Sequence, residues 1–364
     1  MTEDKGILIK NIYYMLTYAF QVLRQTNYED IEAEHFDEIQ DLFAAILAKG
    51  ISQQLKQGLH KEYITVHETR TSLRGKIDMP ETVRNRVQHK QVISCEYDEL
   101  SENNLLNQIL KTTADILLRS KGVSSDHKNE LKKVLLFFDG IDTVDHTAIQ
   151  WNRIQIQKNN KNYEMLINVC YFVIDGMLQT TEKGSYRMAQ FSDEHMARLY
   201  EKFVLEYYRR HHKELSANAS EIKWDIPKDT EETAVKYLPT MQSDIMLKNK
   251  ARTKTLIIDT KYYTRTMQKQ FDTSYSYHSG NLYQIFTYVK NQAADESGIV
   301  SGMLLYAKTG ETITPDAEFM MSGNKISVKT LDLNMHFSQI STQLDRIVAD
   351  YFKQDEAVSN NEPN

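Results

Sequence analysis

The fold is decided by two neighbouring segments, Met241-Gln-Ser-Asp-Ile-Met-Leu247 and Thr255-Leu-Ile-Ile-Asp-Thr-Lys-Tyr-Tyr263. Both are short apolar runs of the kind found in β-strands, and the polar segment 248–254 between them indicates a hairpin. Because side chains two apart on a strand share a face, we expect Asp259 and Lys261 to point the same way. This pair is the starting point of a candidate functional site.

Two carboxylates meet one ammonium group at the end of this hairpin, because the turn brings Asp244 beside Asp259 and Lys261. Like charges among apolar residues are unfavourable unless a cation offsets them. Hard carboxylate oxygens suit Mg²⁺, and Mn²⁺ can substitute for it. We therefore expect metal-assisted hydrolysis of a phosphodiester, with both aspartates as metal ligands and the lysine orienting water or stabilising the transition state. The alternative is an ordinary salt bridge on a half-exposed sheet.

Two helices flank the hairpin and add polar residues to this candidate site. Glu201, on a helix expected to begin near Asp193, can supply a further carboxylate directly or through water. On a helix expected over 281–292, Gln284 and Tyr288 are four residues apart and share one side. We expect Gln284 to reach the DNA backbone or a metal-bound water, and Tyr288 to contact DNA. The alternative is an ordinary hydrogen bond between the two side chains.

Charge is distributed unevenly along the chain. The net charge of −6 argues against a protein that coats nucleic acid by bulk positive charge. Between residues 248 and 270, however, seven basic residues accompany one acid. The candidate DNA contacts in this stretch are Lys248, Lys250, Arg252, Lys254, Arg265 and Lys269. Such a cluster can hold a phosphate backbone, or it can be a solvated hairpin edge that resists aggregation.

The expected elements differ between the two halves of the 364-residue chain, which is long enough for two domains. The first half is mostly helical, with a small β region, and its helices are expected near 10–23, 35–57, 102–118, 127–138 and 163–178. In the second half, alternating strands and helices favour an α/β fold with a mixed sheet covered by helices on both sides. We place the domains at 1–185 and 186–352, followed by a disordered tail, 353–364.

Several classes of protein are excluded by the composition. No segment is long and apolar enough to span a membrane, and the N-terminus lacks a signal-peptide pattern, so we expect a cytoplasmic protein. Cys95 and Cys170 lie in separate apolar segments without metal-ligand spacing. We expect both to be reduced core residues, and we expect no structural zinc site.

Several motifs together resemble a known family. Asp244, fourteen intervening residues, Asp259-Thr-Lys261 and then the Gln284-x-x-x-Tyr288 helix resemble the PD-(D/E)XK nuclease signature in its RecB-like form. Ser243 stands where that motif has proline, and the second acid is aspartate rather than glutamate. The wider sequence resembles the McrC family, the nuclease subunits of McrBC modification-dependent restriction systems. The likeness is carried by Asn11-Ile-Tyr-Tyr-Met-Leu-Thr-Tyr18, Leu73-Arg-Gly-Lys-Ile-Asp78, Tyr97-Asp-Glu-Leu-Ser-Glu-Asn-Asn-Leu-Leu-Asn-Gln-Ile-Leu110, Leu199-Tyr-Glu-Lys-Phe-Val204 and Leu238-Pro-Thr-Met-Gln-Ser-Asp244.

The resemblance implies a division of labour between the two halves. The N-terminal domain would dock with a ring of McrB-like AAA+ subunits and stimulate their GTPase, while a PD-(D/E)XK-like domain with a mixed central sheet cuts double-stranded DNA. The partner would bind GTP and recognise the modified cytosine, and the sequence accordingly has no Gly-x-x-x-x-Gly-Lys-Ser/Thr phosphate loop. Arg74 and Lys76 are the candidate partner contacts, unless they are solvated charges beside a glycine turn.

Two other functions stay open on the sequence alone. One is a stand-alone RecB-like nuclease of the repair or resolvase type, although the long first half exceeds what a minimal nuclease needs. The other is a non-catalytic activator of a motor ring, in which the acidic site is degenerate.

Overall fold

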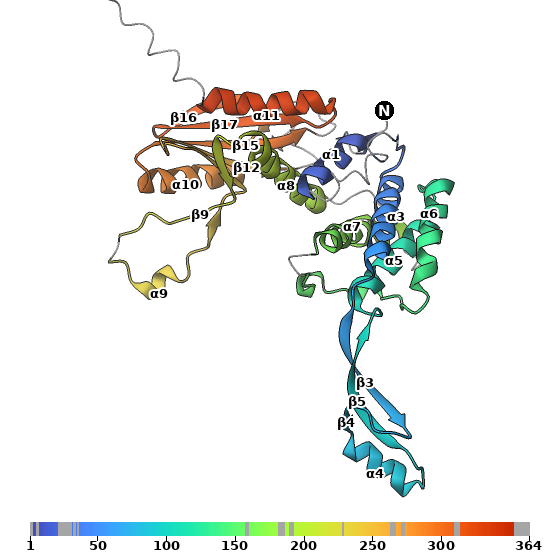
Figure 1. Cartoon of the computed structure of the whole chain (residues 1–364). Coiled ribbons are helices and arrows are strands. Elements are labelled where there is room, and N and C mark those ends of the chain that lie inside the picture. Colours follow the sequence, from blue (N-terminus) through green and yellow to red (C-terminus); the bar gives the residue numbers. More distant parts are fainter. Residues whose placement is uncertain are drawn as a thin grey trace, which may run out of the picture. The chain divides into compact units, whose positions relative to one another are not determined.

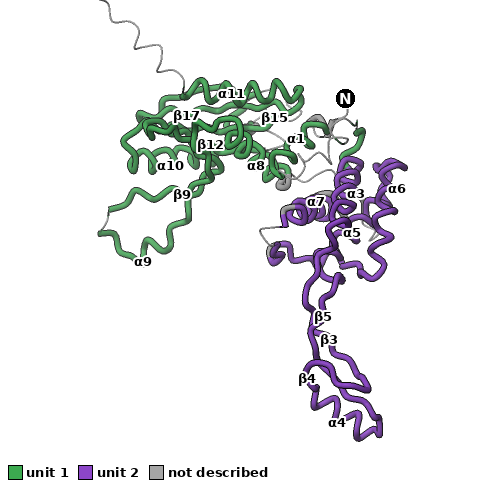
Figure 2. Tube along the Cα trace, viewed as in Figure 1, with its two compact units in different colours: residues 1–39, 189–364 green, residues 40–188 purple. Residues whose placement is uncertain are grey.

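The computed structural model describes residues 3–4, 7–20, 31, 34, 36–156, 160–180, 186–188, 193–227, 229–262, 267–270, 274–308 and 314–352. The chain forms two compact units, one of residues 40–188 and one of residues 1–39 together with 189–364 (Figure 2). The expected boundary segment, 180–185, lies outside the described residues except for Thr180, and so does the expected disordered tail at 353–364.

The unit of residues 40–188 joins a group of helices to a long β arm (Figure 1). Its helices are α3 (Ile39–Gln57), α5 (Leu105–Arg119), α6 (Ser125–Leu135) and α7 (Lys161–Met177), with 3₁₀ turns η3 (Leu136–Phe138), η4 (His146–Ala148) and η5 (Trp151–Arg153). A short pair of strands, β6 (Leu178–Thr180) and β7 (Tyr186–Met188), follows α7. Cys95 and Cys170 are buried and free in this unit, as expected.

The arm consists of β3 (Glu62–Arg70), β4 (Lys76–Ile77), α4 (Met79–Val87) and β5 (Ile93–Ser101). β5 pairs antiparallel with β3 along its whole length and with β4 near the tip. Helix α4 was not predicted, although its start has the usual signals. Asp78 is the N-cap and accepts a hydrogen bond from the backbone N of Glu81 at 3.2 Å, and Pro80 lies in the first turn.

A six-stranded mixed sheet forms the centre of the second unit, with strand order β16-β17-β15-β12-β11-β8. The strands are β8 (Leu215–Asn218), β11 (Ile245–Asn249), β12 (Lys254–Lys261), β15 (Ile299–Lys308), β16 (Ala317–Met321) and β17 (Asn324–Asp332). β12, β15 and β17 run parallel, and the other neighbours are antiparallel. The smaller elements are β1 (Glu3–Asp4), β2 (Ile7–Leu8), β9 (Glu221–Ile222), α9 (Glu232–Val235), β10 (Met241–Gln242), β13 (Gln268–Gln270) and β14 (Ser274–Ser276).

Helices cover both faces of this sheet (Figure 1). α10 (Ser279–Asp295) packs on one face, and α8 (Asp193–His211) and α11 (Phe337–Phe352) pack on the other. The hydroxyls of Ser327 and Tyr351 hydrogen-bond at 2.7 Å and fasten α11 to β17, while Tyr207 donates to Asp345 Oδ1 at 2.8 Å and ties α8 to α11. The expected fold class, a helical first part followed by a mixed sheet flanked by helices, is confirmed. β8 and β16 were not predicted.

The first helix lies with the sheet unit rather than with the helices of residues 40–188, where the domain limits 1–185 had placed it. α1 (Ile9–Ala19) is buried on nearly all sides and therefore needs cover from more than one neighbour. Asn11 donates to the carbonyls of Leu333 and Met335, both at 2.7 Å. Tyr18 hydrogen-bonds through its hydroxyl to His211 Nε2 of α8 at 2.8 Å. Within the described residues, no helix is both long and apolar enough to cross a membrane.

Gly302 of β15 sets how closely α10 approaches the sheet. A Cβ atom here would lie 2.7 Å from Val289 Cγ2 and 2.8 Å from Ile285 Cγ1. Because both side chains are fully buried and cannot move aside, we expect Gly302→Ala to destabilise the fold by about 1–3 kcal/mol in urea denaturation. Gly280→Ala in the first turn of α10, where no atom lies within 4 Å, is the control and should not destabilise. Equal stability of the two variants would contradict this packing.

Candidate functional site

The two aspartates meet at the outer end of the β11–β12 pair. Ile245 lies opposite Ile258, so the next positions outward are Asp244 and Asp259. Ile257 faces the apolar cluster under α10, and strand alternation therefore turns Asp259 to the α10 side as well. The structure thus brings the expected acidic pair together at the end of the central strand.

Asp259 is the least solvated of these groups, with 1% of its surface exposed. Lys261 Nζ lies 2.6 Å from Asp259 Oδ2, which confirms that the two side chains share a face. The ammonium group is close enough for an ion pair, but neither oxygen of Asp259 receives a hydrogen bond of acceptable geometry. A buried carboxylate without hydrogen-bond donors is costly, and a bound cation is one arrangement that offsets the cost.

Asp244 is held through one oxygen. Its Oδ2 accepts hydrogen bonds from the backbone N and from Oγ1 of Thr260, both at 2.7 Å. Neither bond involves Oδ1. This oxygen and the carboxylate of Asp259 are therefore the hard donors that the two strand ends offer to a cation.

Glu201 of α8 adds a third carboxylate whose charge is disfavoured. Burial, followed by the charges of Asp244 and Asp259, raises its pKa from the ordinary 4.5 to about 7, against the opposing effects of Lys261 and Arg198. Burial also raises the pKa of Asp259, although Lys261 opposes that shift. The excess of negative charge at this end of the sheet is therefore large enough to hold a proton near neutral pH.

Lys261 is held from the other side by α10. Its Nζ donates to Gln284 Oε1 at 3.1 Å, and Gln284 Nε2 donates to the hydroxyl of Tyr288 at 3.0 Å. The alternative weighed for Gln284 and Tyr288, a hydrogen bond between them, is thus present. It also extends to Lys261, so the three side chains form a chain that fixes the ammonium group beside Asp259.

The donor set fits a cation that retains water. Among the described residues, no three histidine, cysteine, aspartate or glutamate side chains are grouped so that they could hold a metal ion together. Asp244 and Asp259 alone offer a two-carboxylate set. Mg²⁺ is commonly bound by one or two carboxylates together with waters and substrate phosphates, so a pair of acids beside a partly buried third is compatible with it.

Comparisons with known proteins show the family to which the chain belongs. The family model described as McrBC 5-methylcytosine restriction system component matches residues 3–307. The chain belongs to this family. It is 28% identical over 354 residues to the type IV methyl-directed restriction enzyme EcoKMcrBC of Escherichia coli K12, covering 96% of this chain and all of that protein. It shares its fold with a chain in the solved half-complex of Thermococcus gammatolerans McrB AAA+ hexamers with bound McrC, at 17% identity and a TM-score of 0.51, covering 94% of this chain and 75% of that one.

In this McrBC family member the hairpin's basic residues lie away from the acidic pair. The register places Lys248 opposite Thr255, so Lys248, Lys250, Arg252 and Lys254 are at the turn. Five residues of strand, about 17 Å, separate Lys254 from Asp259. Lys248 is moreover ion-paired with Glu296. The side chain of Lys269 and all of Arg265 lie outside the described residues. The structure thus separates these four basic residues from the acids, and their contact with DNA stays a prediction.

Arg74 and Lys76 flank a glycine near the tip of the arm. The Arg74 guanidinium lies 4.0 Å from the Tyr97 ring centre and 3.5 Å from Glu99 Oε1, so it braces the arm. Gly75 has a φ of 71°, and a Cβ there would lie 2.5 Å from the Glu96 carbonyl oxygen. The glycine turn is therefore present, and contact of Arg74 or Lys76 with a partner stays a prediction.

An apolar stripe on α4 was missed by the sequence analysis. Met79, Val83 and Val87 follow one another at four-residue spacing and are 60%, 53% and 74% exposed. This α4 stripe was not predicted because no helix was predicted between the two long strands of the arm. Large apolar side chains grouped on an exposed helix indicate a surface for contact with another molecule.

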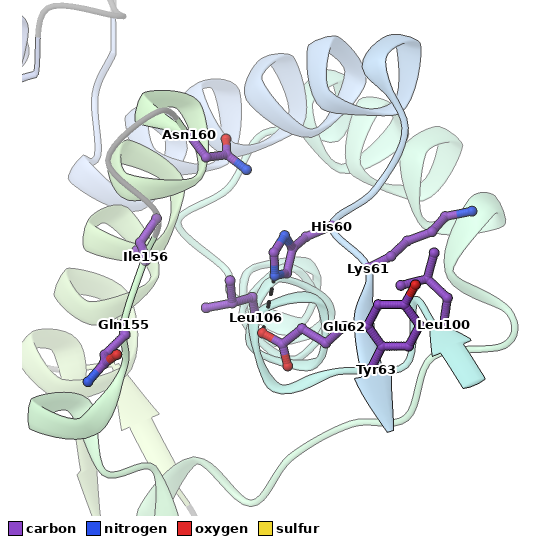
Figure 3. A pocket seen from close by; sticks show the side chains of 9 residues that line it. All are labelled: His60, Lys61, Glu62, Tyr63, Leu100, Leu106, Gln155, Ile156 and Asn160. Carbon is purple, nitrogen blue, oxygen red and sulfur yellow. Dashed lines mark hydrogen bonds and ion pairs between the residues drawn. The ribbon is translucent and has the colours of Figure 1, made fainter. Parts of the chain in front are cut away.

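A cavity lies at the root of the arm (Figure 3). It has a volume of about 620 Å³, and His60 and Glu62 face each other in it at 3.1 Å. It is lined by His60, Lys61, Glu62, Tyr63, Leu100, Leu106, Gln155, Ile156 and Asn160. The mixed lining contains no group of acids like that of the sheet unit, and no sequence motif predicted this cavity.

The raised pKa of Glu201 has a consequence for stability. The folded state binds this proton more tightly than the unfolded state, so the free energy of unfolding decreases as pH rises from 4.5 to about 7. We expect thermal denaturation of the metal-free protein to show a smaller decrease over this range in Glu201→Gln. Glu221→Gln, at an exposed residue of β9, is the control and should follow the wild type. Identical profiles for wild type and Glu201→Gln would contradict the burial of this charge.

Proposed function

We propose that this chain is the nuclease subunit of a McrBC-like restriction system and hydrolyses DNA phosphodiester bonds with Mg²⁺. The observation that carries the proposal is the buried carboxylate of Asp259, which lies beside a second carboxylate, Asp244, and is neutralised in part by Lys261 at 2.6 Å. A charged pair of this kind is difficult to explain as a stabilising element, because a buried ion pair contributes little to stability when its oxygens stay unsatisfied.

The residues divide the chemistry among them. Asp244 and Asp259 would hold Mg²⁺, and the bound cation would polarise the scissile phosphate and lower the pKa of water. Lys261 stabilises the negative charge that develops on the phosphate oxygens. Gln284 and Tyr288 keep the ammonium group in place for that role. Glu201, with its pKa of about 7, is poised to accept a proton from the attacking water at neutral pH.

The arm is the part of the chain that suits a partner. We assign it to contact with a McrB-type AAA+ ring in the cytoplasm. In this assignment the ring binds GTP and recognises modified cytosine in double-stranded DNA, and this chain stimulates the GTPase activity of the ring. The α4 stripe supports this assignment, because exposed apolar side chains at the tip of a long arm are buried only when another molecule covers them. Arg74 and Lys76 lie beside the stripe in the sequence and would flank the contact.

Replacing Asp259 by Asn tests the nuclease. The variant keeps the shape of the side chain but removes the charge that holds the metal, so about 4 kcal/mol of transition-state stabilisation, or about a thousandfold in rate, should be lost. Cleavage of methylated plasmid by the assembled complex is the measurement. Complex formation and GTPase stimulation should persist, and Asp295→Asn at the far end of α10 should cut normally.

The same assay separates the other functions. Mg²⁺-dependent cleavage retained in Asp259→Asn would contradict the assigned site. Wild-type chain that cuts at full rate without partner and GTP would instead be a stand-alone nuclease. Wild-type chain that stimulates GTP hydrolysis and never cuts would be a non-catalytic activator.

Polar substitutions on the α4 stripe test the arm. Val83→Gln combined with Val87→Gln should weaken binding to the McrB-type ring by about a hundredfold or more, because each buried valine contributes about 1.5 kcal/mol or more. Leu136→Gln with Phe137→Gln is the matched control, since both residues are exposed, at 78% and 67%, outside the arm. Binding of each variant to the immobilised McrB-type ring can be measured by biolayer interferometry. Equal binding of both double variants and the wild type would exclude the stripe from the interface.

A further inference from the structure

Thr260 occupies a position where the strand ladder ends. The predicted strand over residues 241–247 is interrupted, because β11 begins only at Ile245 and β10 ends at Gln242. β10 pairs with β9 rather than with β12. The backbone N–H of Thr260 is consequently beyond the last β11 pair, although Thr260 is buried at 9% exposure. A buried N–H requires an acceptor from elsewhere.

The acceptor is the side chain of Asp244. Its Oδ2 accepts a hydrogen bond from the backbone N–H of Thr260 at 2.7 Å. This oxygen replaces the backbone carbonyl that would accept this bond if the β11–β12 pairing continued. The same oxygen takes the Thr260 hydroxyl, also at 2.7 Å. Two donors from one residue converge on one oxygen, so the carboxylate plane is fixed and Oδ1 is the oxygen left to face the site.

The chain around Asp244 is fixed independently of Thr260. Ser243, buried at 1% exposure, donates its backbone N–H to the carbonyl of Ser220 at 3.0 Å and its hydroxyl to the same carbonyl at 3.1 Å. Ser220 returns its own N–H to Ser243 Oγ at 3.3 Å. This serine pair anchors the backbone just before the chain enters β11, at the position where the nuclease signature has proline. The side chain of Asp244 is then oriented by Thr260 alone among the contacts described above.

We propose that Thr260 is a positioning residue for the metal-binding carboxylate of Asp244, acting through its hydroxyl. The inference rests on the proposed metal-dependent activity and adds to it a role for the residue between Asp259 and Lys261. A carboxylate that is already oriented loses less rotational freedom when it binds a cation. Hydrogen-bond partners of ligating carboxylates typically change metal affinity by about 10- to 100-fold when removed.

Three variants of the full chain test this role. Thr260→Val keeps the branched shape and the backbone N–H but removes the hydroxyl, whereas Thr260→Ser keeps the hydroxyl. The readout is the dissociation constant of Mn²⁺, measured by calorimetry without DNA or partner, with circular dichroism as a check of folding. We expect Thr260→Val to bind Mn²⁺ about 10- to 100-fold more weakly than the wild type, and Thr260→Ser to bind within about threefold of it. Asp259→Asn should lose binding.

Each possible result decides between the inference and the proposed function. Wild-type chain that binds no Mn²⁺ would overturn the metal site itself. Wild-type binding that is lost in Asp259→Asn but unchanged in Thr260→Val would overturn the role of Thr260 alone. Equal weakening in the Ser and Val variants would also overturn it, because the hydroxyl would then not be the cause. If Thr260→Val does not fold, Thr260→Ala removes the same hydroxyl with less bulk and is judged by the same criteria.

Discussion

The repulsion between two carboxylates at a buried strand end is the constraint on which the rest of this site depends. Asp259 is almost fully removed from water beside Asp244, and the ammonium group of Lys261 lies 2.6 Å from its Oδ2. Burial raises the pKa of Asp259, Lys261 lowers it, and Asp244 raises it, so the lysine does not cancel the cost of the buried charge. Such an arrangement is unfavourable in itself and persists only because the surrounding fold determines it.

Three parts of the fold hold these charged side chains together. The central strand β12 carries Asp259 and Lys261, the interrupted neighbouring strand presents Asp244, and helices on opposite faces contribute Glu201 and Gln284. The first helix of the chain closes the same unit, because α1 packs on α8, the helix that bears Glu201. All residues of the chemistry thus belong to one unit, and the arm with its apolar α4 stripe belongs to the other. The proposed function accordingly assigns cleavage to one unit and partner contact to the other.

Local sequence was sufficient to predict that the two acids and the lysine lie together, but it was not sufficient to predict what surrounds them. Alternation along β12 and the turn before it were enough to predict that Asp259 and Lys261 share a face with Asp244 beside them. The distance between the basic residues and the acids was not predicted, because a cluster in the sequence does not define the strand register. The antiparallel pairing puts Lys254 at the opposite end of the hairpin from Asp259. The unit into which α1 packs could not be predicted either, because its contacts with Leu333 and His211 join residues that are far apart in the sequence. Helix α4, in contrast, could have been predicted, because Asp78 and Pro80 are typical of the start of a helix.

The central claim is that Asp244 and Asp259 together bind a divalent cation. The most direct measurement is anomalous diffraction from crystals of the full chain soaked in Mn²⁺. The account predicts an anomalous peak about 2.1 Å from one carboxylate oxygen of Asp244 and one of Asp259. Crystals that diffract well and show no peak between these two side chains, with Lys261 Nζ still 2.6 Å from Asp259, would contradict it.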